Sequence, residues 1–221
     1  MSDNATNFLY PFLQNEEKGT LAEVLAEVQA STRQKCQEVV TMRQDFIESQ
    51  AEQLVQTAQA MAAAFADGKK LLAFGNGGSA TDAQDMVADF MQPASGSPPT
   101  SSRALPALSL TNDIAVVTGV GNDVGFDNVF ARQIISFGEA GDMALGFSTS
   151  GESANVLSAL QRAKQMNLLT IGISGYGGGQ MKAAGLDFCL TVDSSYVPRI
   201  QEVQATIYHT LWVLVHQILD D

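Results

Sequence analysis

The stretch KLLAFGNGGS at residues 70–79 decides the fold, together with a second stretch of the same kind, MALGFSTSGES at residues 143–153. In each, an apolar segment runs into a turn rich in Gly and Ser, and a helical pattern follows. The first amides of a helix have no partner within the helix, and the aligned peptide dipoles place partial positive charge there. Glycines let the backbone approach an anion and hydroxyls add neutral donors, so such a turn can hold a phosphate without Lys or Arg. Two such turns in one chain favour phosphate binding.

Strands and helices alternate along the rest of the chain. Such alternation implies parallel strand pairing with right-handed crossovers, so the sequence predicts a three-layer α/β/α sandwich around a five-stranded parallel sheet. Both turns then lie at the carboxyl ends of strands, where open α/β sheets bind ligands. The expected strands cover residues 71–74, 105–110, 143–147, 169–174 and 188–192. The expected helices cover residues 80–91, 126–137, 153–166, 180–184 and 198–219.

Two further helices are expected before the first strand. Apolar residues recur at helical spacing from residue 20 onward, and residues 58–65 form an Ala-rich stretch that predicts a second helix. Residues 1–17 mix Asn, Pro and acidic residues with aromatic ones and are interpreted as an irregular arm. Residues 18–221 are expected to form a single domain that includes the N-terminal helices.

The charge balance restricts the possible ligands. The chain has 24 acidic and 12 basic residues, a formal net charge of −12. This argues against binding to nucleic acid, which depends on Lys and Arg neutralising phosphates, and against docking on an anionic membrane. A small phosphorylated ligand is compatible with the charge, because backbone amides in a pocket can outweigh a distant surface charge.

The cysteines and the termini indicate a cytoplasmic, soluble protein. Cys36 and Cys189 are two unrelated thiols without metal-type spacing, as expected in a reducing compartment. The first residues lack the charged and apolar regions of a signal peptide. No apolar run approaches the roughly 20 residues of a membrane span.

Neither turn matches a common nucleotide signature. No Lys follows the first turn as a P-loop requires, and Ala80 stands where the third glycine of GxGxxG would be. No nucleotide cofactor is therefore expected. Ordinary turn chemistry is the alternative for the first turn, and helix capping by Ser150 or Ser153 is the alternative for the second.

Three aspartates follow the first turn on one predicted helix. Asp82 and Asp89 are seven residues apart and share a face, with Asp85 close by. They form either a solvated acidic face, with Asp82 serving the helix dipole, or a cleft in which Asp85 and Asp89 act as a base or as a pair of metal ligands.

Both histidines lie on the last predicted helix. His209 and His216 are seven apart and share a stripe, and Gln201 lies eight residues before His209. A catalytic role for His209 competes with simple packing, because a histidine beside Tyr208 and Trp212 is often a core residue.

At these positions the chain resembles the sugar isomerase (SIS) domain family, and within it the sedoheptulose-7-phosphate isomerases, also called phosphoheptose isomerases. The resemblance runs from about residue 45 to the C-terminus. The matching stretches are GNGGSATDAQDMVADF (75–90), LTNDIAVVTGVGND (110–123), GDMALGFSTSGESANVLSAL (141–160), TIGISGYGGGQM (170–181) and PRIQEVQATIYH (198–209).

The resemblance implies a homotetramer with active sites between subunits and a small phosphorylated sugar as substrate. It places the phosphate on four residues of the second turn, namely Ser148, Thr149, Ser150 and Ser153. It places the sugar along the first turn, at Asn76, Gly77, Gly78 and Ser79, with Asp123 contacting sugar hydroxyls and Gln201 also binding substrate.

The family interconverts an aldose and a ketose phosphate by moving a proton between C1 and C2 through an enediol. Its members use a Glu as base and a last-helix His as partner, and some hold zinc with a His, that Glu, a Gln and the last-helix His. His209 and Gln201 match here, whereas Asp89 stands at the Glu position and Asp85 at the zinc His position. The set Asp85, Asp89, Gln201 and His209 is richer in oxygen, so it would favour Mn²⁺ or Mg²⁺ over Zn²⁺. Operation without a metal is equally compatible with these residues.

The departures from the family pattern leave a second interpretation of the function open. The chain also resembles a non-catalytic relative, a replication-initiator-associating protein that keeps the fold and lacks the base. It could therefore be a phosphosugar-binding or protein-binding module. The retained carboxylate at Asp89 and the retained His209 favour an enzyme, and the altered pair also fits a different sugar phosphate.

Overall fold

The computed structural model describes residues 20–92 and 103–220, and these divide into two compact units at the boundary between Val40 and Thr41. A single helix, α2 (Leu21–Ala66), belongs to both units. The prediction of two helices before the first strand was therefore wrong, because no Gly or Pro interrupts this stretch. The predicted irregular arm at residues 1–17 lies outside the described residues.

In the first unit, α2 begins with a capping box. The Thr20 backbone amide donates to Glu23 Oε2 at 2.7 Å, and the Glu23 amide donates to Thr20 Oγ1 at 3.4 Å. This reciprocal pairing satisfies two donors that a helix start otherwise leaves open.

The second unit is built on a five-stranded parallel sheet, which confirms the predicted fold class. The strand order is β2-β1-β3-β4-β5, so β1 and β3 are neighbours in the sheet although β2 and several helices lie between them in the chain. The strands are β1 (Leu71–Phe74), β2 (Ala107–Ser109), β3 (Met143–Ser148), β4 (Leu169–Ser174) and β5 (Phe188–Thr191).

The helices follow the prediction with one addition. The helix α4 was not predicted, because its sequence IAVVTGVGNDV combines β-branched residues with two glycines, both poor helix formers. It forms with Asp113 as its cap, whose carboxylate accepts from the Val116 amide at 3.0 Å. The helices after α2 are α3 (Gly78–Met91), α4 (Ile114–Val124), η2 (Phe126–Asn128), α5 (Val129–Phe137), α6 (Ala154–Gln165), η3 (Tyr176–Gly178), α7 (Gly179–Ala183) and α8 (Val197–Asp220).

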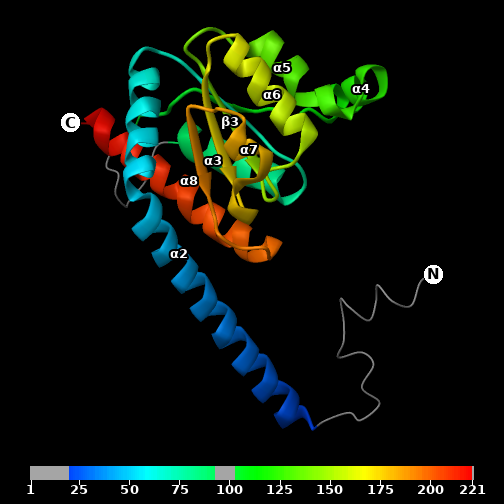
Figure 1. Cartoon of the computed structure of the whole chain (residues 1–221), viewed down its shortest axis with the longest axis vertical. Coiled ribbons are helices and arrows are strands. Elements are labelled where there is room, and N and C mark those ends of the chain that lie inside the picture. Colours follow the sequence, from blue (N-terminus) through cyan, green and yellow to red (C-terminus); the bar gives the residue numbers. More distant parts are fainter. Residues whose placement is uncertain (1–19, 93–102, 221) are drawn as a thin grey trace. The chain divides into compact units, whose positions relative to one another are not determined.

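Two hydrophobic clusters cover the two faces of the sheet. One combines the sheet with α3, α8 and residues 46–65 of α2, and the other combines it with α5, α6 and α7 (Figure 1). Gly146 shows how closely these layers approach, because a Cβ there would lie 2.8 Å from Val156 Cγ1 on α6. The three-layer packing thus fixes where α3 and α6 begin, next to the carboxyl ends of β1 and β3. No helix in the described ranges is long and apolar enough to cross a membrane.

A buried carboxylate ties β1 to β3 at their amino ends. Asp142 accepts hydrogen bonds from the backbone amides of Lys70 at 3.0 Å and Glu139 at 2.9 Å, and its Oδ2 lies 2.6 Å from Lys70 Nζ. Burial alone would raise the Asp142 pKa, but the bonds from Lys70 and Glu139 outweigh it and hold that pKa below its usual value.

We expect Asp142→Asn to destabilise the protein by about 1.5–3 kcal/mol at pH 7, the usual worth of hydrogen bonds to a charged group. Denaturant unfolding measures this, with the exposed Asp67→Asn as control. Because folding lowers the Asp142 pKa, its contribution is complete above about pH 4 and is lost as the pH falls through the folded-state value. The gap between wild type and Asp142→Asn should therefore shrink below about pH 4; a gap that is constant down to pH 2 would contradict this assignment.

Candidate active site

The two predicted turns lie side by side because their strands are neighbours. The residues of β1 and β3 that pair with each other end at Phe74 and Gly146. Shortly after each strand the chain enters a turn, and both turns lie at the same edge of the sheet. The first turn (residues 75–79) leads into α3 and the second turn (residues 148–153) leads into α6. This is the ligand-binding edge of an open parallel sheet.

The first turn depends on glycines. Gly77 caps α3 with a φ of 55°, a conformation that favours glycine, and no side chain caps this helix. A Cβ on Gly78 would lie 1.9 Å from Gln201 Nε2, so the Gln201 amide packs directly over the bare backbone. The structure thereby brings Gln201 to Gly78 in the first turn, which also contains Asn76, Gly77 and Ser79.

The hydroxyls of the second turn face each other instead of capping α6. Ser148 Oγ lies 2.9 Å from Ser153 Oγ, and Ser153, although it is the cap residue, makes no side-chain capping bond. Ser150 Oγ accepts from the Glu152 amide at 3.2 Å, within the turn. Neither serine occupies the first amides of α6, which argues against the capping alternative, and Asn155 Oδ1 accepts from one of them, the Val156 amide, at 3.0 Å. The hydroxyls and backbone amides of this turn form a neutral candidate cradle for an anion.

The loop after β4 holds the second turn in place. Gly175 donates its amide to the Thr149 carbonyl at 2.9 Å, and Met181 donates to the Gly151 carbonyl at 3.0 Å. Glu152 accepts from the Gln180 amide at 2.9 Å and from its side chain at 2.5 Å. Backbone contacts from β4 and α7 therefore make this turn a preformed structure.

The aspartates of α3 differ in their surroundings. Asp85 is exposed, whereas Asp82 is only 9% exposed, and its Oδ2 has no hydrogen-bond partner among the described residues. Burial, helped by the charge of Asp85, raises the pKa of Asp82 to about 6. Burial and Asp85 also raise the pKa of Asp89, against the opposing effect of His209. Burial along this part of α3 thus makes both carboxyl groups more basic than an exposed aspartate.

Asp89 and His209 meet across α3 and α8. Asp89 Oδ2 lies 3.4 Å from His209 Nε2. His209 Nδ1 lies 2.6 Å from the Ala205 carbonyl, which can only accept, so Nδ1 carries a proton and Nε2 is free to exchange one beside the carboxylate. The His209 side chain is 55% exposed, so the pair faces an open surface.

The predicted site residues fall into two groups within one chain. Gln201 and His209 are eight residues apart on α8, which is about 12 Å along a helix. Gly78 and Asp89 are eleven apart on α3, about 16 Å. The turns with Gln201 form one group and Asp89 with His209 the other, while the exposed Asp123 accepts from its neighbour Asn122 at 2.8 Å.

This separation bears directly on the predicted metal site. Among residues 20–92 and 103–220, no three His, Cys, Asp or Glu side chains are grouped so that they could hold a metal. Gln201, the fourth predicted ligand, belongs to the other group. The set Asp85, Asp89, Gln201 and His209, as placed in one chain, therefore does not fit a metal.

Three residues near the site were not recognised from the sequence as functional candidates. Tyr208 is buried with its ring centroid 4.5 Å from that of His209, and burial together with the three aspartates raises its pKa. Asp82 is buried, although one of the two interpretations of the aspartates had it on a solvated face serving the helix dipole, and Asn155 is 2% exposed. His216 is a packing residue, stacked 5.9 Å from Phe90 and fully buried.

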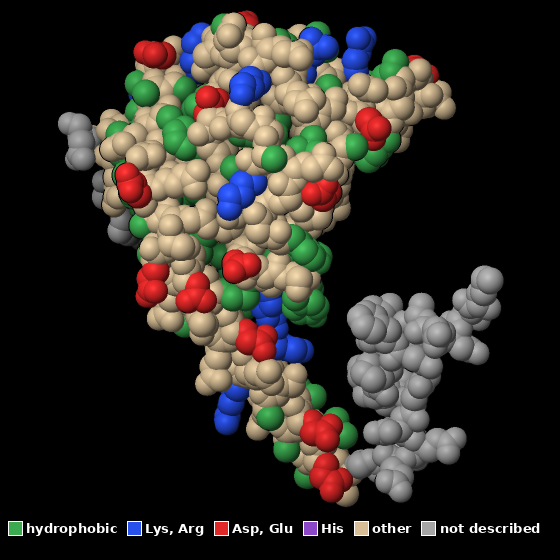
Figure 2. Space-filling model, viewed as in Figure 1, with side chains coloured by type: hydrophobic (Ala, Val, Ile, Leu, Met, Phe, Trp, Pro, Cys, Tyr) green, Lys and Arg blue, Asp and Glu red, His purple; other side chains and the backbone are tan. Residues whose placement is uncertain are grey.

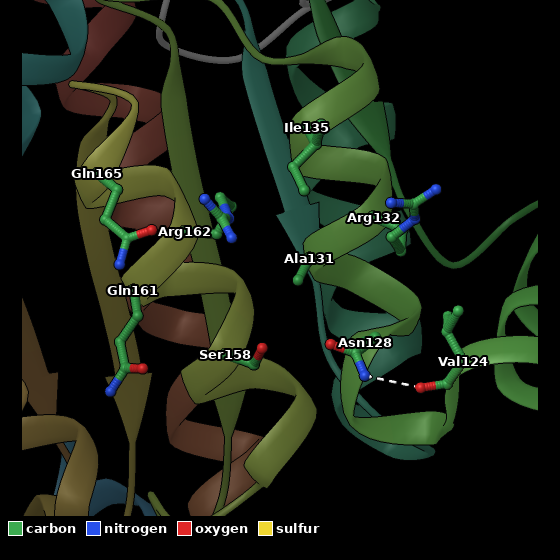
Figure 3. Close-up of a pocket in the computed structure, with 9 residues that line it drawn as sticks. All are labelled: Val124, Asn128, Ala131, Arg132, Ile135, Ser158, Gln161, Arg162 and Gln165. Carbon is green, nitrogen blue, oxygen red and sulfur yellow. Dashed lines mark hydrogen bonds between the residues drawn. The ribbon is translucent and has the colours of Figure 1, made fainter.

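A separate cavity of about 380 Å³ lies between α5 and α6, on the opposite face of the sheet from His209. In Figure 3, Arg162 lies in the gap between the two helices, whereas Arg132 points away from α6, so the two guanidinium groups do not converge on one ligand. Basic side chains over α5 and α6 are visible in Figure 2, with acidic ones scattered elsewhere on that face. None of the predicted site residues lines this cavity.

Comparison with known proteins places this geometry in a family. The SIS domain model matches residues 36–175. A phosphoheptose isomerase from Nitratidesulfovibrio vulgaris (strain DSM 19637 / Miyazaki F) is 40% identical over 178 residues, 80% of this chain and 83% of that protein. One from Geobacter sp. (strain M21) is 40% identical over 196 residues, 89% of this chain and 97% of that protein.

Solved structures agree with the sequence comparisons. A phosphoheptose isomerase from Neisseria gonorrhoeae superposes with a TM-score of 0.78 at 34% identity, covering 86% of this chain and 99% of that one. One from Francisella tularensis also gives 0.78, at 29% identity, covering 88% and 98%. With its five-stranded sheet and its two uncapped turns, the chain belongs to the SIS domain family, in its phosphoheptose isomerase branch.

Proposed function

We propose that this enzyme interconverts sedoheptulose 7-phosphate and a heptose 7-phosphate through an enediol. The observation that carries the proposal is the Asp89–His209 pair, a partly buried carboxylate with an imidazole 3.4 Å away, in a chain that also holds an uncapped phosphate cradle. The relatives named phosphoheptose isomerases support this substrate class, and they do not favour the non-catalytic alternative.

The proposed reaction is a balanced proton shift. The Asp89 carboxylate removes a proton from C1 of the ketose, and the C1–H electron pair forms the C1=C2 bond. His209 enters this step as the imidazolium, and the C2 carbonyl oxygen takes its Nε2 proton and becomes the second enediol hydroxyl, which leaves His209 neutral. His209 then accepts the proton of the C1 hydroxyl, the C1=O bond forms, and C2 recovers the proton held by Asp89. No oxidant or further reactant is needed.

The surroundings of Asp89 suit a general base. A base works best when its pKa lies near the working pH, and burial raises the Asp89 pKa toward neutrality. His209 has its Nδ1 proton fixed by the Ala205 carbonyl, so Nε2 faces both Asp89 and the open surface where hydroxyl protons would be exchanged. The second turn would hold the phosphate through backbone amides and the hydroxyls of Ser148 and Ser153.

The same proposal includes a homotetramer with sites between subunits. The two groups of site residues lie about 12 Å apart along α8 and about 16 Å apart along α3, so in the proposed assembly a second copy would bring the base of one chain to the second turn of another. Exposed apolar surface supports such contacts, because α4 is apolar yet has no buried residue. Ile114 at its start is 71% exposed, and Phe126, which follows the end of α4, is 57% exposed. A bound divalent metal stays a prediction that would likewise need ligands from two chains.

During incubation with sedoheptulose 7-phosphate in deuterated water, NMR should show deuterium replacing a C1 proton of the ketose and the C2 proton of the aldose. Asp89→Asn and His209→Ala should each slow exchange by about 10²–10⁴-fold, the usual contribution of a positioned acid or base. Asp67→Asn should exchange at the wild-type rate. Sugar-phosphate binding without exchange in the wild type would contradict the isomerase proposal.

The metal prediction is tested in the same assay. If Asp85 is a ligand, chelation should lower the rate, Mn²⁺ should restore it better than Zn²⁺, and Asp85→Asn should weaken metal binding measured by calorimetry. Equal rates before and after chelation, with no metal taken up, would show operation without a metal.

Mixing of two inactive variants tests the shared site. Ser150→Asp places a negative charge in the phosphate cradle, and Asp89→Asn removes the base from the other group. When the two are unfolded together and reassembled, about a quarter of the sites should combine two intact groups and regain activity, given random mixing of a symmetric oligomer. Continued inactivity of the mixture, with each variant properly folded, would mean that both groups serve one site within one chain.

A further inference from the structure

The first and second turns are joined by a reciprocal pair of side-chain amides. Asn76 Nδ2 donates to Asn155 Oδ1 at 2.8 Å, and Asn155 Nδ2 donates to Asn76 Oδ1 at 2.8 Å. Asn155 Oδ1 also accepts from the Val156 amide at 3.0 Å. Asn155 is the second residue of α6 and is 2% exposed, whereas Asn76 is half-buried at the ligand-binding edge.

This pair requires an amide on both sides. Each partner presents one donor and one acceptor to the other, and a carboxylate at either position would set two oxygens against each other. Because Asn155 is 2% exposed, loss of Asn76 would leave the buried Asn155 amide without a replacement hydrogen-bond partner for its Nδ2 group. The Val156 bond also fixes which way the Asn155 amide points.

The Asn76–Asn155 pair lies past the last residues at which β1 and β3 pair with each other. The pairing of β1 with β3 ends at Phe74 and Gly146, so sheet hydrogen bonds do not set the separation of the turns that follow. Asn76 lies in the first turn, and Asn155 is rooted in the helix that the second turn begins. Their two hydrogen bonds are a direct link between the sugar side and the phosphate side of the candidate site.

We infer that Asn155 is a positioning residue, which sets the spacing between the phosphate cradle and the first turn without touching substrate itself. The inference rests on the proposed function, because a sugar phosphate of fixed length must reach both turns at once. A change in that spacing would leave the phosphate bound while its carbon chain is misplaced. A displacement of about 1 Å at the reacting atoms can cost about 100-fold in rate.

A double-mutant cycle on kcat/KM tests whether Asn155 acts through Asn76. We expect Asn155→Ala to lower kcat/KM for sedoheptulose 7-phosphate by about 100-fold. In an Asn76→Ala background the same substitution should cost less than about 3-fold, because the link is already broken. If the two losses instead multiply, Asn155 does not act through Asn76 and the inference is overturned.

Inorganic phosphate separates positioning from general damage. As a competitive inhibitor it needs only the second turn, so its inhibition constant in Asn155→Ala should stay within about 3-fold of wild type. If phosphate affinity falls as far as kcat/KM, Asn155 supports the cradle itself and the inference is wrong. Where Asn155→Ala does not fold, Asn155→Ser takes its place, because Ser is accepted near a helix start and is too short to reach Asn76.

Gln133→Ala is the matched control. Gln133 is also a buried amide with two hydrogen bonds, to the Leu110 and Val129 carbonyls, but it lies away from both turns. Gln133→Ala should lower the melting temperature with little change in kcat/KM. An equal loss of activity in both variants would mean that Asn155→Ala lowers activity only by destabilising the protein.

The outcomes also separate this inference from the proposed function. If the wild type binds the sugar phosphate without turning it over, the isomerase proposal fails, and the Asn155 cycle is measured on binding affinity with the same expectation. If the wild type binds neither the sugar phosphate nor phosphate, both proposals fail. Wild-type turnover with independent effects of the two asparagines overturns the inference alone.

Discussion

The parallel pairing of β1 with β3 is the constraint on which the rest of this site depends. The two strands are distant in sequence, and only their adjacency brings the Gly-rich turn and the Ser-rich turn to one edge. Around it, the packing of α6 against Gly146 and the tie between Asp142 and Lys70 hold the strands in register. The residues within each turn set which groups it offers to a ligand, whereas the pairing of β1 with β3 decides that both turns can face the same ligand.

The placement of the site residues in two groups fits the proposed active site shared between two copies of the chain. Within one chain, Gly78 at the start of α3 and Gln201 near the start of α8 lie at the turns, whereas Asp89 near the end of α3 and His209 in the middle of α8 form the other group. The rise of a helix separates the two groups by about 12 Å along α8 and about 16 Å along α3. An enzyme of this design can bind through one surface and react on another, provided that assembly brings the two surfaces together.

Much of this was predictable from the sequence, and the failures have physical causes. Each predicted strand and the two turns were found, because strand-to-helix turns carry strong local signals in Gly and Ser. The helix α4 was missed because glycines and β-branched residues hid it, and α2 was divided because an Ala-rich stretch resembled a separate helix. The 3.4 Å contact of Asp89 with His209 and the Asn76–Asn155 bridge depend on tertiary packing, which spacing along the chain does not encode.

The neutral character of the phosphate cradle has a consequence for how fast substrate arrives. Amides and hydroxyls attract an anion only at short range, whereas the net charge of −12 repels a phosphate dianion from much farther away. Salt screens this long-range repulsion far more than it screens contacts inside a pocket. Association should therefore become faster as ionic strength rises, the reverse of the behaviour of enzymes that steer phosphates with lysines and arginines.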